Sequence, residues 1–140
     1  MKKKLGWILS LTLCFALIIA ETLVTASADT SVSYIDENGD EQTCASATEV
    51  TESDSTWGDD GNNGWYVVND DVTISSRITV TGNVHLILAD GYTLTASQGI
   101  NVTDTNSLTI YGQAEGTGAL TANGGFLQAA IGGDRQQSGG

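Results

Sequence analysis

The sequence predicts an all-β protein whose short strands wind into a parallel β-helix. Three observations support this prediction. Apolar residues alternate with Thr, Asn and Ser along short runs, which is the period-2 pattern of strands with one buried face. The runs are separated by Gly, Asn and Asp, and the chain contains no proline. Similar segments also recur, such as Leu-Thr-Ala at 94–96 and again at 120–122.

Residues 1–28 have the three parts of a secretory signal-peptide helix. Lys2, Lys3 and Lys4 form its positive region, an apolar run of 16 residues spans 5–20, and Ala26-Ser27-Ala28 supplies a cleavage site. A membrane span needs roughly 20 residues, which favours cleavage over the rival interpretation, an uncleaved anchor. We therefore expect a protein that is secreted or displayed at the cell surface, with no membrane contact after cleavage.

The chain that remains after cleavage is strongly acidic. Without residues 1–28, the chain has 16 acidic residues and two basic ones, Arg77 and Arg135, so its net charge is −14. No lysine remains. Phosphate binding depends on Lys and Arg, so this balance argues against nucleic acid as a partner. Cys44 is the one cysteine left, which excludes an internal disulfide and leaves a thiol that is buried, free or paired between chains.

Residues 29–64 are predicted to form a hairpin and an acidic loop that cap the coils. Strand-like residues at 31–35 and 42–45 flank Asp36-Glu37-Asn38-Gly39-Asp40, where Asn-Gly favours a type I′ turn. Residues 48–55 are polar and acidic, and the Gly, Asp and Asn residues of 58–64 predict a loop.

Residues 65–140 are predicted to be the opening coils. We expect strands at 65–68, 72–74, 77–81, 84–88, 92–96, 100–102, 107–111 and 119–122. Strands this short fit a sandwich, a barrel or a solenoid. Repetition favours the solenoid, because one three-stranded turn of a parallel β-helix takes about 20–30 residues. A β-sandwich stays open as the alternative.

Three segments carry a resemblance to a known family. They are Ile-Thr-Val-Thr-Gly-Asn-Val-His-Leu-Ile-Leu-Ala-Asp-Gly (78–91), Ser-Leu-Thr-Ile-Tyr-Gly-Gln (107–113) and Ala-Ala-Ile-Gly-Gly (129–133). They resemble large bacterial surface proteins that carry right-handed parallel β-helix, pectate-lyase-like repeats, some of them labelled carbohydrate-binding. The resemblance covers roughly residues 31–134 and implies a fold and a bacterial surface location more strongly than an activity.

The number of coils leads to a further expectation. Residues 72–134 hold about two to three coils, whereas a solenoid needs at least three to bury its inner face. We therefore expect a truncated β-helix, an N-terminal fragment whose partners include further coils of the same chain. A small protein that associates end to end is the alternative.

Aromatic residues are the candidate ligand-binding residues. Trp57, Trp65, Tyr66, Tyr92 and Tyr111 have the ring faces that stack on sugars, and the competing interpretation is packing.

Catalytic and metal signals are weaker. The pairs Asp59-Asp60 and Asp70-Asp71 fall in turns rather than across a substrate, and His85 is expected to face outward alone. The acidic turn at 36–41 lacks the spacing of a calcium loop. A Ca²⁺ site among Asp54, Asp59, Asp60 and Asp70 is left as an open alternative to having no cofactor.

These observations favour a non-catalytic adhesion or carbohydrate-binding module whose partner is a glycan or another cell-surface component. One alternative is the N-terminal fragment of a polysaccharide lyase or hydrolase whose catalytic part lies downstream. The other is a structural surface stalk.

Overall fold

The computed structural model describes residues 30–58 and 64–134, and within these residues the protein is all-β, with strands and no helix. The predicted signal peptide lies outside the described residues. No helix among the described residues is long and apolar enough to cross a membrane. The strands are β1 (Thr30–Ile35), β2 (Glu41–Glu49), β3 (Thr56–Trp57), β4 (Trp65–Val68), β5 (Val72–Ile74), β6 (Ile78–Val80), β7 (Asn83–Leu88), β8 (Thr93–Ala96), β9 (Ile100–Asn101), β10 (Ser107–Tyr111) and β11 (Ala119–Ala122).

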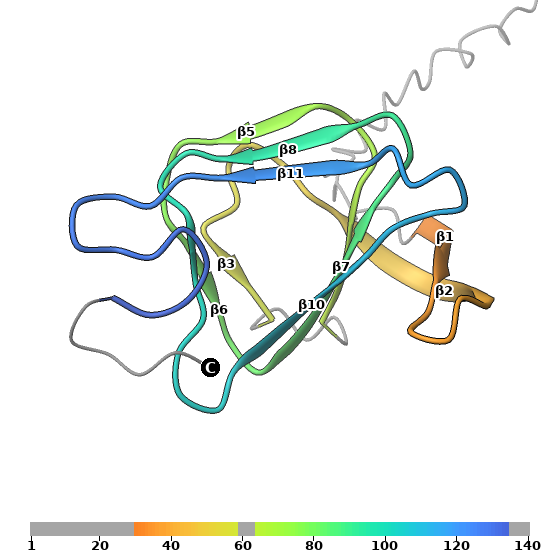
Figure 1. The fold of residues 1–140 in the computed structure, drawn as a ribbon, viewed down its shortest axis with the longest axis horizontal. Helices are drawn as coiled ribbons and strands as arrows, with labels where there is room; N and C mark the ends of the chain where they lie inside the picture. The colour runs from red at the N-terminus through yellow and green to blue at the C-terminus, as the bar shows by residue number, and fades with distance from the viewer. Residues whose placement is uncertain (1–29, 59–63, 135–140) are drawn as a thin grey trace, which may run out of the picture.

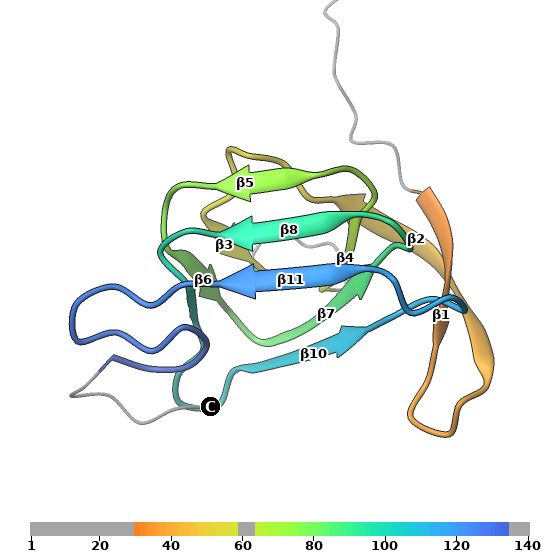
Figure 2. The same ribbon diagram turned by 45° about the horizontal axis from the view of Figure 1, so that its top comes forward.

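The strands form three sheets that surround a common interior (Figures 1 and 2). Their orders are β1-β2-β4-β7-β10, β11-β8-β5 and β3-β6-β9. The β1–β2 pair is antiparallel, and every other pair of these strands is parallel. The chain therefore passes from sheet to sheet and returns to each sheet one strand further along.

Each parallel pairing joins two successive turns of the chain. Trp65 pairs with His85 in one sheet, and Ile78 pairs with Ile100 in another. The partners are 20 residues (65 to 85) and 22 residues (78 to 100) apart in the sequence. The repeats noted in the sequence are thus neighbours in space, because Leu-Thr-Ala at 94–96 lies directly beside its copy at 120–122.

Stacked apolar side chains fill the interior. In β6, Ile78 and Val80 are buried while Thr79 between them is exposed, as the period-2 pattern predicts. Ile78 lies beside Ile100 in the parallel pairing, and both are fully buried. The interior begins with Val50 and the ring of Trp57, which is 0% exposed.

The predicted hairpin is present as β1 and β2, but its turn differs from the expected type I′ turn. That turn needs positive φ at both central residues, and of Asn38 and Gly39 only Gly39 has it, with φ of 88°. The Asp36 side chain instead shapes the loop, because its Oδ1 accepts hydrogen bonds from the backbone N–H groups of Asn38 (2.9 Å) and Asp40 (3.0 Å).

The hairpin packs against the outer face of the β4–β7 sheet. Cys44 and Ala47 of β2 contact Val67, Ile87 and Ala89 in a second apolar cluster, separate from the interior. The expectation of a polar outer face is therefore wrong for β7, since Ile87 is fully buried on that side. Covering on both faces explains why β4 and β7 contain continuous apolar runs.

Two element predictions at 48–64 need correction. β2 continues to Glu49, and Thr56–Trp57 forms β3 where only polar loop was expected. β3 pairs with β6 in parallel, with Thr56 opposite Thr79 and Trp57 opposite Val80. A strand this short has no visible period, so its pairing partner rather than its own sequence defines it.

Asp90 ties two neighbouring turns together. Its carboxylate accepts hydrogen bonds from the backbone N–H groups of Glu115 and Thr117, both at 2.9 Å. These bonds favour the charged form, so they lower the pKa of Asp90 below the ordinary aspartate value of 3.8.

Asp90→Asn is expected to lower the melting temperature at neutral pH and to matter less in acid. A folded-state pKa below the unfolded value gives stability that is fully present above about pH 3.8. That stability is lost as the pH falls through the lower folded-state pKa. When thermal unfolding is measured from neutral pH to about pH 2, the difference in melting temperature between wild type and variant should decrease as the pH falls. Glu115→Gln removes the same charge without these bonds, and an equal effect from it would contradict the explanation.

Candidate functional site

Four aromatic side chains meet on the outer face of the β4–β7–β10 sheet. Trp65 of β4 stacks on His85 of β7 with ring centroids 4.4 Å apart and an interplanar angle of 14°. Tyr111 of β10 lies 5.4 Å from Trp65. Tyr34 of β1 completes the group, at 5.0 Å from Trp65 and 4.8 Å from Tyr111. We call these four residues the aromatic cluster.

The strand register builds this cluster. Trp65 and His85 are direct partners in the parallel pairing, so their side chains leave the sheet side by side. Tyr111 pairs with Ile87, two positions further along, and its hydroxyl reaches back to hydrogen-bond with Nδ1 of His85 at 3.1 Å. All three outward rings therefore lie on one face.

Two contacts hold the hairpin over this face. The backbone N–H of Ile35 donates to the carbonyl of Gly112 at 3.0 Å. The Gln113 side-chain amide donates to the carbonyl of Ser33 at 2.9 Å, which joins residues 80 positions apart in the chain. These bonds flank Tyr34 and fix its ring against Trp65 and Tyr111.

A groove opens between the hairpin and the cluster. It has a volume of about 390 Å³ and is lined by Tyr34, Thr43, Cys44, Ala45, Ser46 and Trp65. The volume lies within the usual range for small-ligand sites, about 300–1,000 Å³. The lining includes two aromatic residues, Tyr34 and Trp65, and two hydroxyl residues, Thr43 and Ser46, so it combines stacking surfaces with uncharged hydrogen-bonding groups. We call this the aromatic groove.

Cys44 is a buried free thiol at the floor of this groove. Its Sγ donates to the carbonyl of Ser46 at 3.2 Å. The thiol contributes to the apolar packing between β2 and the sheet.

Desolvation raises the pKa of the Tyr111 hydroxyl, and the nearby Tyr34, Glu37 and Asp36 raise it further. Tyr111 therefore stays neutral, which keeps its hydroxyl able to hydrogen-bond with His85.

The five predicted aromatic residues do not form one surface. The structure brings Trp65 and Tyr111 together, whereas Trp57 and Tyr66 are 0% and 2% exposed and belong to the interior. Their rings leave no face to a ligand. Tyr92 is 39% exposed but lies in the turn before β8, outside the aromatic cluster.

Two cluster members were absent from the predicted set. His85 does face outward, as expected, but it is half-buried between Trp65 and Tyr111 rather than alone. Tyr34 lies on the predicted hairpin, and its role depends on contacts with a strand far along the chain. The hairpin alone carries no signal of that contact.

The acidic residues considered for Ca²⁺ have other partners or lie outside the described residues. Asp54 accepts hydrogen bonds from the Thr51 hydroxyl at 2.7 Å and from Nε1 of Trp57 at 3.2 Å. Asp70 accepts one from the N–H of Asp71 at 2.8 Å, while Asp59 and Asp60 lie outside the described residues. Residues 30–58 and 64–134 contain no group of three or more His, Cys, Asp or Glu placed to hold a metal ion.

No protein-family model, curated protein or solved structure matches this chain.

Proposed function

We propose that this protein is a non-catalytic module outside the cell that binds a glycan in the aromatic groove. The observation that carries the proposal is the Trp65–His85 stack, extended by Tyr34 and Tyr111, of which Trp65 and Tyr34 line the groove. Planar apolar rings with polar rims suit the C–H faces of sugars, which are themselves apolar faces ringed by hydroxyl groups. Thr43 and Ser46 add uncharged hydroxyl residues to the groove lining.

We further propose that the strands are the opening coils of a right-handed parallel β-helix, displayed at a bacterial cell surface. Parallel pairing between segments one coil apart in the sequence supports the β-helix. It argues against the alternative β-sandwich, whose sheets are antiparallel. The apolar run and cleavage site at 5–28 support export.

Further coils of the same kind are the proposed structural partner. Within the described residues, β10 and β11 each pair with a strand on one side only. The side chain of Ile110 is 40% exposed and that of Ile131 is 45% exposed, although both residue types favour burial. Unpaired edges and exposed apolar side chains at one end of a stack are suited to pairing with another coil.

Binding is tested by titrating neutral polysaccharides into the protein and into Trp65→Ala. Loss of the central ring should weaken binding on the order of tenfold or more. Tyr92→Ala removes an exposed aromatic ring outside the groove and should bind like the wild type. Tyr34→Ser serves as a second groove variant in case Trp65→Ala unfolds. A panel of polysaccharides that all fail to bind the folded wild-type protein would refute the proposal.

A further inference from the structure

The hairpin tip next to the aromatic cluster is acidic. Asp36, Glu37, Asp40 and Glu41 form the tip of the hairpin whose strand carries Tyr34. The hydrogen bond from Ile35 to Gly112 places the start of this tip beside the end of β10, where Tyr111 lies. Glu37 and Asp36 both act on the Tyr111 hydroxyl electrostatically. The hairpin that carries Tyr34 therefore brings carboxylates close to the aromatic cluster.

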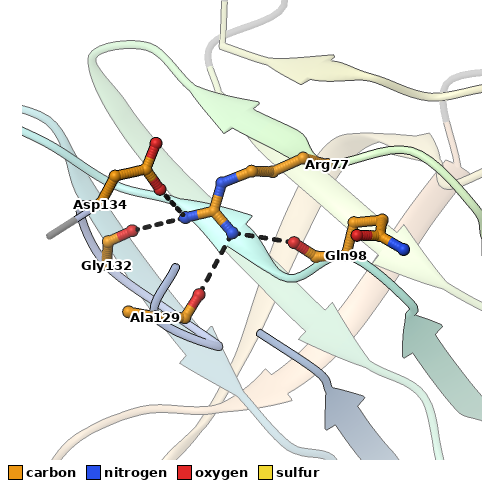
Figure 3. A network of polar contacts seen from close by, with 5 residues as sticks. All are labelled: Arg77, Gln98, Ala129, Gly132 and Asp134. Atoms are coloured by element: carbon orange, nitrogen blue, oxygen red, sulfur yellow. Dashed lines mark hydrogen bonds and ion pairs between the residues drawn. The ribbon is translucent and has the colours of Figure 1, made fainter. Parts of the chain in front are cut away.

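Among the residues that the structure describes, no Lys or Arg lines the groove to offset these carboxylates. Within residues 30–58 and 64–134, Arg77 is the one Lys or Arg, and its side chain is 15% exposed. Figure 3 shows its guanidinium held by carbonyl oxygens of Gln98 (2.8 Å), Ala129 (3.1 Å) and Gly132 (3.1 Å). It also forms an ion pair with Asp134 at 3.0 Å. Arg77 therefore holds residues 129–134 against the strands through these contacts.

The hydrogen-bonding groups of the groove suit an uncharged ligand. Thr43 and Ser46 offer hydroxyl groups. His85 Nδ1 is already bonded to Tyr111. A bound carboxylate or sulfate needs a cationic partner or several aimed N–H groups to replace its water. The groove lining provides neither a Lys nor an Arg.

From this arrangement we infer that the aromatic groove selects neutral polysaccharides and rejects uronate-containing and sulfated ones. The inference rests on the proposed glycan-binding function and narrows its ligand class. Sites that bind acidic polysaccharides do so through basic residues. This groove instead combines aromatic stacking and hydroxyl groups with nearby carboxylates.

The test uses pairs of polymers that differ in charge alone. Each neutral polysaccharide that binds is oxidised at its primary hydroxyl groups to the uronate, and both forms are titrated into the purified protein. Hydroxyethylcellulose and carboxymethylcellulose form a second pair on one backbone. The neutral form should bind at least about tenfold more tightly at low salt. High salt should narrow the gap, because it screens the repulsion.

Single-charge variants connect the effect to the groove. Glu37→Gln should reduce the difference in affinity between the neutral and the acidic polymer. Asp104→Asn removes a charge from the turn before β10 and should leave this difference in affinity unchanged. Equal or tighter binding of the acidic form would overturn this inference while glycan binding stands. Absence of binding to every polymer would overturn both proposals.

Discussion

Replacement of Trp57 by alanine should destabilise the protein by about 3–5 kcal/mol, which is the usual loss for a large aromatic side chain in a core. The Trp57 ring is 0% exposed and packs 5.6 Å from the Tyr66 ring, centroid to centroid. Its Nε1 donates to Asp54 at 3.2 Å. Truncation leaves a cavity at the first layer of the interior and an Asp54 carboxylate that lacks one donor. Urea unfolding measures the loss.

Tyr92→Ala is the matched control for Trp57→Ala. Tyr92 is 39% exposed, so its truncation should change the unfolding free energy by no more than about 0.5 kcal/mol. A loss below about 1 kcal/mol for Trp57→Ala would contradict the placement of its ring inside the coils.

Gly64→Ala should cost about 2–4 kcal/mol, from a strained backbone angle together with a steric clash. Gly64 has a φ of +72°, which L-residues rarely adopt. A Cβ at this position would lie against the carbonyl oxygen of Asn83, well inside van der Waals contact. That carbonyl lies at the start of β7, so the backbones at Gly64 and Asn83 would have to move apart to make room.

Gly82→Ala isolates the backbone strain, because Gly82 has the same φ of +72° but open space around its Cα. It should cost only about 1–2 kcal/mol in the same unfolding measurement. Gly64→Ala should also disturb the Trp65–His85 stack, since the Gly64 carbonyl accepts the N–H of His85 at 2.7 Å. Equal losses for the two glycine variants would show that the coils do not approach closely at Gly64.

Local patterns made most of the strands predictable. In β6 and β8, apolar residues alternate with Thr, and this pattern predicts a strand with one buried face. The buried residues are Ile78 and Val80 in β6 and Leu94 and Ala96 in β8. Gly and Asn at the breaks locate the ends of the strands. The hairpin was predictable for the same reasons, although Asp36 and not a type I′ turn shapes its loop.

The aromatic cluster was only half predictable, because it depends on register between distant segments. The sequence predicts Trp65 and Tyr111 as binding residues because they are aromatic, yet nothing in their local sequence distinguishes them from the buried Trp57 and Tyr66. His85 joins them only through pairing between successive coils, and Tyr34 only through contacts between the hairpin and a distant strand. The burial of β7 residues under the hairpin could not be predicted for the same reason, because it too depends on contacts between distant segments.

Glycan binding in the aromatic groove is tested most directly by mapping NMR chemical-shift changes during titration with a neutral oligosaccharide. We predict that the changes concentrate on Tyr34, Trp65, Thr43 and Ser46, which line the groove. In the same titration of Trp65→Ala, these changes should appear only at oligosaccharide concentrations about tenfold higher or more. Changes centred on Tyr92 or on the outward-facing Thr residues of β5 and β8, or no changes for any neutral oligosaccharide, would contradict glycan binding in the groove.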